Sequence, residues 1–265
     1  MLTPNWYSVP LGPWLRREPD KRLYFLLFRP DAYIKGIRRL YVTSTASRVE
    51  ATTLTDEIRI GGTGPRLVVF RNAISGDADR YFPTFLGHHD LLRQELVRIT
   101  RPRFVPAPQV EPHVAIHVRL GDFAKVDVTR LHLGAHSARL PIDWYVAMLA
   151  GIRSRLGSDV RAVVYSDGRD ADLAPLLSLN NVRRASDGSA ITHMLAIAQA
   201  NLLIGTGSGM SIWGAFLGQV PRLCFPGQRL LRTFVEDGRE PECELARDIP
   251  DAFATIVGHK LLATR

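Results

Sequence analysis

The sequence predicts an α/β fold in which one parallel sheet carries helices on both faces. Three observations lead to this prediction: a nearly continuous apolar run at 114–118, several short apolar runs after it, and stretches of helical length between them. Strands buried on both faces of a parallel sheet are nearly continuous in apolar residues. Strands that alternate with helices form right-handed βαβ units. The carboxy-terminal part of the chain therefore predicts a doubly wound domain.

The elements are expected in a defined order. Residues 1–110 contain three strand-like runs, followed by a helix-like segment that opens on an aromatic turn; these lie at 23–28, 39–42, 66–70 and 81–99. The proline-containing segment 105–111 has no periodicity and predicts a linker. After it we expect strands at 114–119, 160–165, 182–185, 202–205 and 221–225. Helices are expected between and after these strands, at 141–156, 171–179, 189–200 and 211–218.

These elements divide the chain into two parts. Residues 1–110 are short for an independent doubly wound domain, so we expect a shortened and irregular amino-terminal α/β domain there. Residues 111–265 contain enough strands and helices for one complete nucleotide-binding domain.

The composition indicates which broad class of protein this chain belongs to. Hydrophobic residues make up 46% and charged residues 23% of the 265 residues, as in soluble globular proteins. No apolar run reaches the ~18–20 residues of a membrane span, and the start lacks the regions of a signal peptide. Two cysteines, Cys224 and Cys243, are too few for a disulfide framework or a cysteine zinc site. We therefore expect a cytoplasmic enzyme.

The net charge of +8 lies mostly in residues 1–110, which hold 17 Lys and Arg against 10 Asp and Glu. A dispersed basic surface of this kind is either simply solvated or attracts an anionic glycan, a lipid-linked acceptor or a membrane surface. No zinc-finger spacing or basic-aromatic RNA signature accompanies it, so we expect no nucleic-acid partner. Peripheral association with the inner face of a membrane stays open, as does the oligomeric state.

The most informative motif follows the first strand of the second domain. VAIHVRLGDF at 114–123 delivers His117, Arg119 and Asp122 to the carboxyl end of a strand, where ligands collect in open α/β sheets. The guanidinium of Arg119 suits phosphate oxygens, and Gly121 allows a tight backbone turn. The segment therefore predicts an anionic ligand.

Two more motifs follow strands of the same sheet. In LLIGTGSGMSIWGAFLG at 202–218, a glycine-rich turn opens a helix and is either a phosphate cradle or a plain tight turn. It is not a dinucleotide fingerprint, because Met210 stands where glycine is needed, and it is not a P-loop. In VVYSDG at 163–168, Asp167 either accepts from a nucleoside or opens the next helix. Because all three motifs share one edge of one sheet, we favour a common ligand site.

Taken together, HVRLGD at 117–122, YSD at 165–167 and SGMSIWGAFL at 208–217 resemble the motifs of the α-1,2-fucosyltransferases and, more broadly, of the fucosyltransferase superfamily. The resemblance covers roughly residues 80–225, with the motifs in family order. It implies a two-domain GT-B architecture whose carboxy-terminal domain holds GDP-fucose. It further implies inverting transfer of fucose to a sugar hydroxyl of a surface glycan or lipid-linked saccharide, without a metal or other cofactor.

The resemblance also implies roles for individual residues. Arg119 stabilises the charge that grows on the departing diphosphate, and the N–H groups of the turn at 208–211 share that task. Ser166 and Asp167 meet the nucleoside, while His117 braces the Arg119 turn. The full set of substrate-binding residues that it implies is His117, Arg119, Gly121, Ser166, Asp167, His193, Ser208, Gly209, Met210 and Ser211.

A carboxylate after the Arg119 motif would serve as general base. Asp127 stands at the family's distance from the motif, and Asp122 is the alternative. The sequence also departs from the family: Leu120 replaces a second basic residue, and His193 stands where relatives have a guanine-contacting Asp. The family's amino-terminal Gly-x-Gly-Asn loop has no counterpart, which is a further reason to expect a shortened first domain.

Two other interpretations lead to different functions. Asp77-Ala-Asp79 and Asp170-Ala-Asp172 match the Asp-x-Asp pattern with which other glycosyltransferases hold Mg²⁺ or Mn²⁺. Activity that survives a chelator would exclude this interpretation. Alternatively, the chain is a remnant of the fold that binds a nucleotide or glycan without turnover. GDP binding without release of GDP from GDP-fucose would favour the remnant.

Overall fold

The computed structural model describes residues 27–29, 34, 36–51, 64, 66–70, 86–235 and 238–262. The chain forms two compact units. The first comprises Met1–Phe85 and Glu95–Pro102, and the second comprises Leu86–Gln94 and Arg103–Arg265. The predicted domain roles stay predictions. None of the helices in the described part of the chain has the length and hydropathy to cross a membrane.

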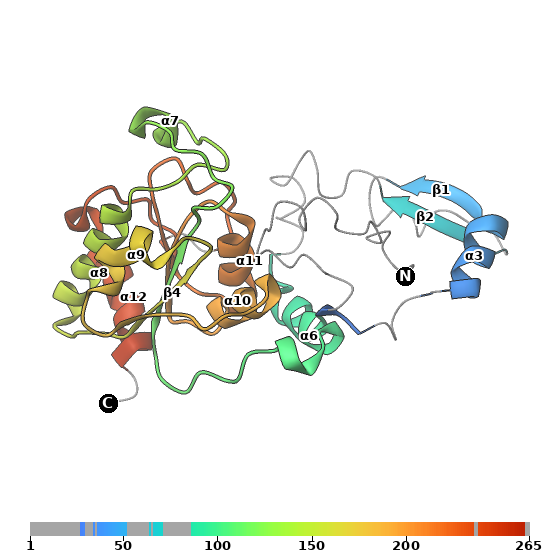
Figure 1. Cartoon of the computed structure of the whole chain (residues 1–265), viewed down its shortest axis with the longest axis horizontal. Helices are drawn as coiled ribbons and strands as arrows, with labels where there is room; N and C mark the ends of the chain where they lie inside the picture. Colours follow the sequence, from blue (N-terminus) through green and yellow to red (C-terminus); the bar gives the residue numbers. More distant parts are fainter. Residues whose placement is uncertain are drawn as a thin grey trace. The chain divides into compact units, whose positions relative to one another are not determined.

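In the first unit, helix α3 (Gly36–Thr45) leads into two parallel strands, β1 (Ser47–Ala51) and β2 (Arg66–Phe70) (Figure 1). The strand predicted at 66–70 is confirmed as β2. The strand predicted at 39–42 is wrong, because these residues lie inside α3. A four-residue run is too short to separate the strand period of two from the helix period of 3.6, and here the helix forms.

The other two predictions for the amino-terminal part are covered only in part. The helix predicted within 81–99 is confirmed over α6 (His89–Ile99), while its aromatic start at 81–85 lies outside the described residues. Most of the strand predicted at 23–28 also lies outside them. Within the described remainder, Phe28 forms an antiparallel bridge with Thr100.

The second unit is built on the predicted sheet of five parallel strands. The strands are β3 (Val114–Val118), β4 (Ala162–Ser166), β5 (Val182–Arg184), β6 (Leu202–Gly205) and β7 (Arg222–Cys224). Their order across the sheet is β5-β4-β3-β6-β7, and every neighbouring pair is parallel. All five predicted strands of this part are therefore confirmed, and the α/β class with them.

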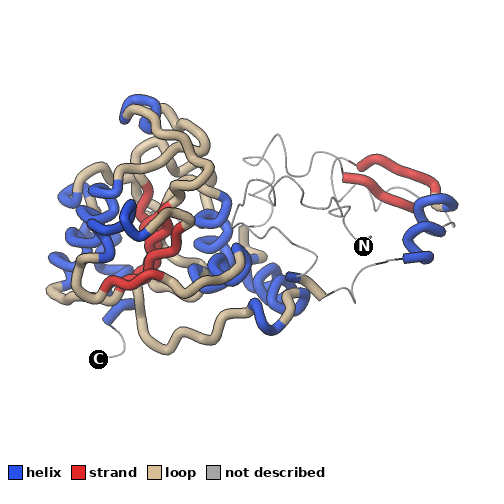
Figure 2. The backbone as a smooth tube through the Cα atoms, in the orientation of Figure 1, coloured by secondary structure: helices blue, strands red, loops and turns tan. Residues whose placement is uncertain are grey.

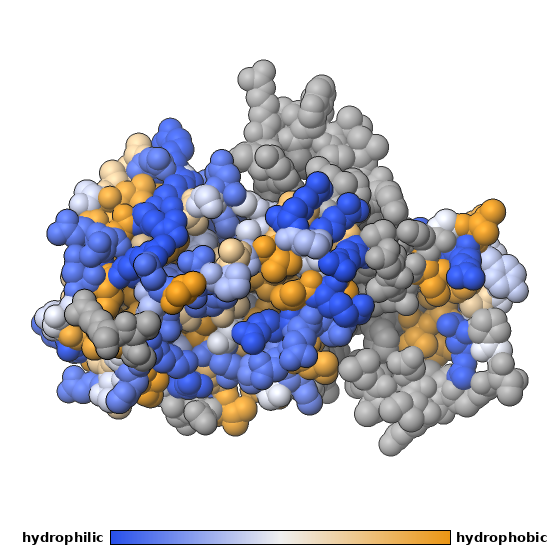
Figure 3. Space-filling view, turned by 90° about the horizontal axis from the view of Figure 1, so that it is seen from below, coloured by the Kyte–Doolittle hydropathy of each residue, from blue (hydrophilic) through white to orange (hydrophobic). Residues whose placement is uncertain are grey.

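Helices cover both faces of this sheet (Figures 1 and 2). They are α8 (Ile142–Leu156), α9 (Asp170–Leu177), α10 (Ala190–Ile197), α11 (Gly209–Gly218) and α12 (Asp251–Leu262). A short helix, α7 (Val128–His132), lies in the connection between β3 and α8. The larger apolar core joins one face of the sheet to α8, α9 and α12, and the smaller core joins the other face to α10 and α11. The sequence did not predict α7 or α12. On the face shown in Figure 3, hydrophilic side chains alternate with apolar patches over the described part of the chain, as is usual for a folded protein.

The strand order places a topological switch point between β3 and β6. From β3 the chain winds outward through β4 to β5, and it then returns to the other side of β3 to form β6 and β7. Loops that leave neighbouring strands in opposite directions open a crevice at the carboxyl ends, which is where ligands bind in open α/β sheets. The register pairs His117 of β3 with Gly205 of β6 at this edge.

Candidate functional site

The structure brings most of the predicted site residues to the carboxyl edge of the sheet. His117 is the fourth residue of β3 and pairs with Tyr165 of β4 and Gly205 of β6. The residues at this edge are His117, Arg119, Gly121, Asp122, Ser166, Asp167, Ser208, Gly209, Met210 and Ser211. His193 lies on α10 and Asp127 at the start of α7, each away from the strand ends.

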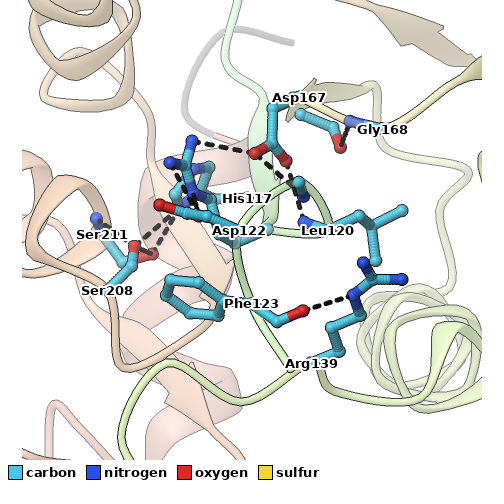
Figure 4. A network of polar contacts seen from close by, with 12 residues as sticks. His117, Leu120, Asp122, Phe123, Arg139, Asp167, Gly168, Ser208 and Ser211 are labelled. Atoms are coloured by element: carbon cyan, nitrogen blue, oxygen red, sulfur yellow. Dashed lines mark hydrogen bonds and ion pairs between the residues drawn. The ribbon is translucent and has the colours of Figure 1, made fainter. Parts of the chain in front are cut away.

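Asp167 holds the turn that follows β3 (Figure 4). Its Oδ1 accepts a hydrogen bond from the Leu120 N–H at 2.8 Å, and its Oδ2 accepts from the Gly121 N–H at 3.0 Å. A Cβ at Gly121 would lie 2.5 Å from Asp167 Oδ2, so only glycine allows this approach. The structure therefore gives Asp167 internal partners, and its predicted contact with a nucleoside stays a prediction.

Arg119 lies between two carboxylates. Its Nε and Nη2 are each 2.9 Å from Asp122 Oδ1, and its Nη1 is 2.9 Å from Asp167 Oδ2. The side chain keeps 23% of its surface exposed. A guanidinium has five N–H groups, and these contacts within the described part of the chain use three of them. Arg119 is thus oriented by the protein while N–H groups stay available to an external anion.

His117 joins β3 to the start of α11. Its Nδ1 lies 2.7 Å from the Ser211 hydroxyl and 3.2 Å from the Ser208 hydroxyl. His117 is only 3% exposed. Burial, followed by the charge of Arg119, lowers the pKa of His117 from 6.5 to about 4, so the imidazole is neutral near pH 7. A Ser–His pair at this distance can act as nucleophile and base, but Ser211 is fully buried, so its hydroxyl is closed to solvent.

The helix start at α11 is the second group of donors at this edge. Ser208 is the N-cap, and its hydroxyl accepts from the Ser211 N–H at 3.4 Å. The first N–H groups of any helix lack intrahelical partners, and the helix dipole adds partial positive charge there. A Cβ added at Gly209 would meet no heavy atom within 4 Å, so this glycine borders open space. The turn can therefore admit an anionic group close to the backbone.

Three predicted residues each make a hydrogen bond with a backbone group a few positions away in the sequence. Ser166 accepts a hydrogen bond from the Gly168 N–H at 3.0 Å. His193 Nε2 lies 3.1 Å from the Ser186 carbonyl, and its ring packs edge-on against Tyr165 at 5.5 Å. Asp127 is exposed and caps α7 by accepting from the Arg130 N–H at 2.9 Å.

Residues that the sequence did not single out also shape this edge. Arg139 Nε donates to the Phe123 carbonyl at 2.6 Å and so closes the base of the connection between β3 and α8 (Figure 4). Gln228, which is distant in the sequence, donates to the Leu131 carbonyl in the same connection. Neither has a local sequence signal, because the partners stand 16 and 97 residues apart.

Only one of the two Asp-x-Asp sequences lies in the part of the chain that the structure describes. Asp77-Ala-Asp79 lies outside the described residues. Asp170 pairs with Arg184, and Asp172 pairs with Arg169 at 3.1 Å, both in the first turn of α9. Among the residues that the structure describes, no group of three or more His, Cys, Asp or Glu side chains is arranged to hold a metal ion.

No protein-family model matches the sequence, and no curated protein matches it either. Solved structures similar to the chain include POFUT1 in complex with GDP, with TM-score 0.30, 19% identity and coverage of 52% of this chain and 46% of that one. The calicheamicin glycosyltransferase CalG4 gives TM-score 0.31 and 16% identity, over 61% of this chain and 41% of that one. The wall teichoic acid polymerase TagF gives TM-score 0.30 and 16% identity, over 72% of this chain and 43% of that one.

The chain thus spans less than half the length of these solved chains. At these identities and TM-scores the similarity says nothing of the activity of this chain.

Proposed function

We propose that this protein is a glycosyltransferase that transfers fucose from GDP-fucose to a sugar hydroxyl, with inversion and without a metal. One observation carries the proposal: the Arg119 turn and the start of α11 flank the same switch point, in motifs that resemble those of fucosyltransferases. The acceptor we propose is a surface glycan or a lipid-linked saccharide.

The donor's diphosphate is the group that this edge suits best. The guanidinium of Arg119 supplies a fixed positive charge, and the N–H groups at 209 and 210 point from the start of α11. Both groups are in place before the substrate binds, so they stabilise the charge on the leaving diphosphate without reorganisation. Leu120 adds no second cation, so the helix start has to share the task with Arg119.

The transfer itself needs a base near the acceptor hydroxyl. In the proposed step the hydroxyl oxygen attacks the anomeric carbon, the bond from that carbon to the phosphate oxygen breaks, and GDP leaves with the electron pair. A carboxylate takes the hydroxyl proton. Asp122 is held by Arg119, whereas Asp127 is exposed at the start of α7, so we assign the base to Asp127.

Release of GDP from GDP-fucose in the presence of a panel of saccharide acceptors tests the proposal. We predict turnover by the wild type that persists in EDTA, and loss of turnover in Arg119→Ala with an unchanged circular dichroism spectrum. Arg247→Ala, an exposed arginine on the 3₁₀ turn before α12, is the matched control and should keep full activity. Unchanged turnover in Arg119→Ala would overturn the assignment of the site.

A second candidate function is binding without turnover. It is favoured by the two carboxylates that pair with Arg119 and by the apolar Leu120 beside it, which together reduce the positive charge available to stabilise a departing diphosphate. GDP binding measured by calorimetry, with no GDP release from GDP-fucose for any acceptor, would select this alternative.

A further inference from the structure

The glycine turn at the start of α11 meets two other loops. One is the connection that carries α7, and the other is the segment 226–235 after β7, here called the β7 loop. A Cβ at Gly207 would lie 2.9 Å from the Gln228 carbonyl oxygen. A Cβ at Gly227, which has φ +76°, would lie 2.5 Å from the Leu131 carbonyl oxygen. Glycine at both contacts lets the backbones approach closely.

Gln228 makes the polar contact within this junction. Its side chain is 3% exposed. Its Nε2 donates to the Leu131 carbonyl at 3.0 Å and to the Ala135 carbonyl at 3.3 Å. Both partners are carbonyls that only accept, so a primary amide with two N–H groups fits them and a carboxylate does not. Leu131 lies in the last turn of α7, and its carbonyl accepts from the Gly134 N–H at 3.0 Å as well as from Gln228.

The β7 loop is itself anchored by a buried ion pair. Arg222 of β7 and Glu240 are 1% and 4% exposed, with Arg222 Nε 2.6 Å from Glu240 Oε1. Arg222 also donates to the Leu231 carbonyl, and Glu240 accepts from the Thr233 N–H at 2.9 Å. The loop is therefore tied to the sheet at two points beyond Gln228, which makes it a fixed support.

We infer that Gln228 is a positioning residue that holds the carboxyl end of α7 against the β7 loop and thereby fixes the side chain of Asp127 at the start of that helix. Asp127 is the N-cap of a helix of only five residues, so the placement of that helix fixes the placement of the carboxylate. The role given to Asp127 rests on the proposed function, whereas the hold of Gln228 on α7 does not.

Amide hydrogen exchange of the free protein tests the hold on α7. The N–H groups of Leu131, Leu133, Gly134 and Ala135 are hydrogen-bonded within this segment and report on it. We expect Gln228→Leu to raise their exchange rates at least tenfold while β3 to β7 keep their protection. Gln94→Leu, at an exposed position of α6, is the matched control and should leave both unchanged. Unchanged exchange of the α7 segment in Gln228→Leu would overturn the inference.

A second variant decides the question if Gln228→Leu loses the fold. In Gln228→Glu the ionised carboxylate faces two carbonyls, whereas the protonated carboxyl can donate to one of them. The quantity to follow is the ratio of the amide exchange rate in Gln228→Glu to that in the wild type. We expect this ratio to fall in the α7 segment as the pH is lowered through the titration of the carboxyl. A ratio that does not change with pH would contradict a role as hydrogen-bond donor.

Measurement of turnover tests whether Gln228 positions Asp127 as the base. With GDP-fucose as donor we expect Gln228→Leu to lower kcat at least tenfold while the Kd for GDP stays within twofold. An unchanged kcat together with raised exchange would show that Gln228 holds α7 but does not position a base. If the wild type shows no turnover, the proposed function fails and the exchange measurement still decides the hold on α7.

Discussion

At the scale of single residues, Asp167 contributes most to the shape of the candidate site. It accepts from two consecutive backbone N–H groups and faces Arg119, all across the gap between the ends of β3 and β4. Hydrogen bonds to a charged acceptor contribute more than neutral ones because the carboxylate is a strong acceptor. The turn that presents Arg119 therefore depends on a side chain from the neighbouring strand.

Asp167→Asn tests this dependence. The amide keeps one acceptor oxygen but places an NH₂ group against a backbone N–H, so one hydrogen bond and the ion pair are lost. We expect the free energy of unfolding to fall by about 1–2 kcal/mol in urea titrations, with partial solvent exposure keeping the loss small. Asp187→Asn, at an exposed position after β5, is the control and should change stability by less than about 0.5 kcal/mol. Equal stability of the two variants would show that the Arg119 turn does not depend on Asp167.

His117 gives a pH dependence with a definite sign. Its pKa is about 4 in the folded chain and 6.5 as the ordinary value, so the unfolded chain takes up a proton first as the pH falls. The stability contributed by the neutral imidazole is complete above about pH 6.5 and is lost toward pH 4, by up to about 3 kcal/mol. We expect His117→Asn, which keeps a polar partner for Ser211, to lack this part of the slope.

Urea unfolding at several pH values between 4 and 7 compares the wild type with His117→Asn. His113 is also buried with a lowered pKa, mainly through desolvation, and gives both proteins a further slope of the same sign. The informative quantity is therefore the difference between the two curves of unfolding free energy against pH. If the two curves run parallel, His117 does not titrate as its burial requires.

At the scale of elements, the start of α11 separates two kinds of glycine. Gly207 faces the β7 loop, where a Cβ would lie 2.9 Å from the Gln228 carbonyl oxygen, whereas Gly209 borders open space. The first glycine therefore serves the packing of the protein, and the second is free to serve a ligand. The two positions stand in the same turn, so their variants form a matched pair.

We expect Gly207→Ala to lower the free energy of unfolding by about 1–3 kcal/mol, because the neighbouring backbone has to move. Gly209→Ala should leave that energy within about 0.5 kcal/mol of the wild type, because alanine suits a helix better than glycine. The same variant should weaken GDP binding at least tenfold by filling the space beside the N–H groups. GDP binding that is unaffected by Gly209→Ala would place the diphosphate elsewhere.

The elements show what the sequence could and could not predict. The strands β3, β4 and β6 were predictable because a buried parallel strand is nearly continuous in apolar residues, and the ends of these three strands carried recognisable polar motifs. α7 has only five residues, too few for a helical period, and the run at 39–42 is compatible with either period. The contacts of Asp167 and Gln228 could not be predicted, since each joins residues more than 40 positions apart.

At the scale of the whole molecule, the switch point between β3 and β6 organises everything that we assign to function. The Arg119 turn leaves one side of it, the start of α11 leaves the other, and the β7 loop supports the segment that carries Asp127. The central claim is that this edge binds the diphosphate of a nucleotide sugar.

Calorimetric titration with GDP tests that claim most directly, because it needs neither an acceptor nor turnover. We expect GDP to bind the wild type and Arg247→Ala with equal affinity. Arg119→Ala should bind GDP about 10- to 100-fold more weakly, the loss expected for charge-assisted hydrogen bonds of about 1.5–3 kcal/mol. Equal affinity of Arg119→Ala and the wild type, or no binding by the wild type, would contradict that claim.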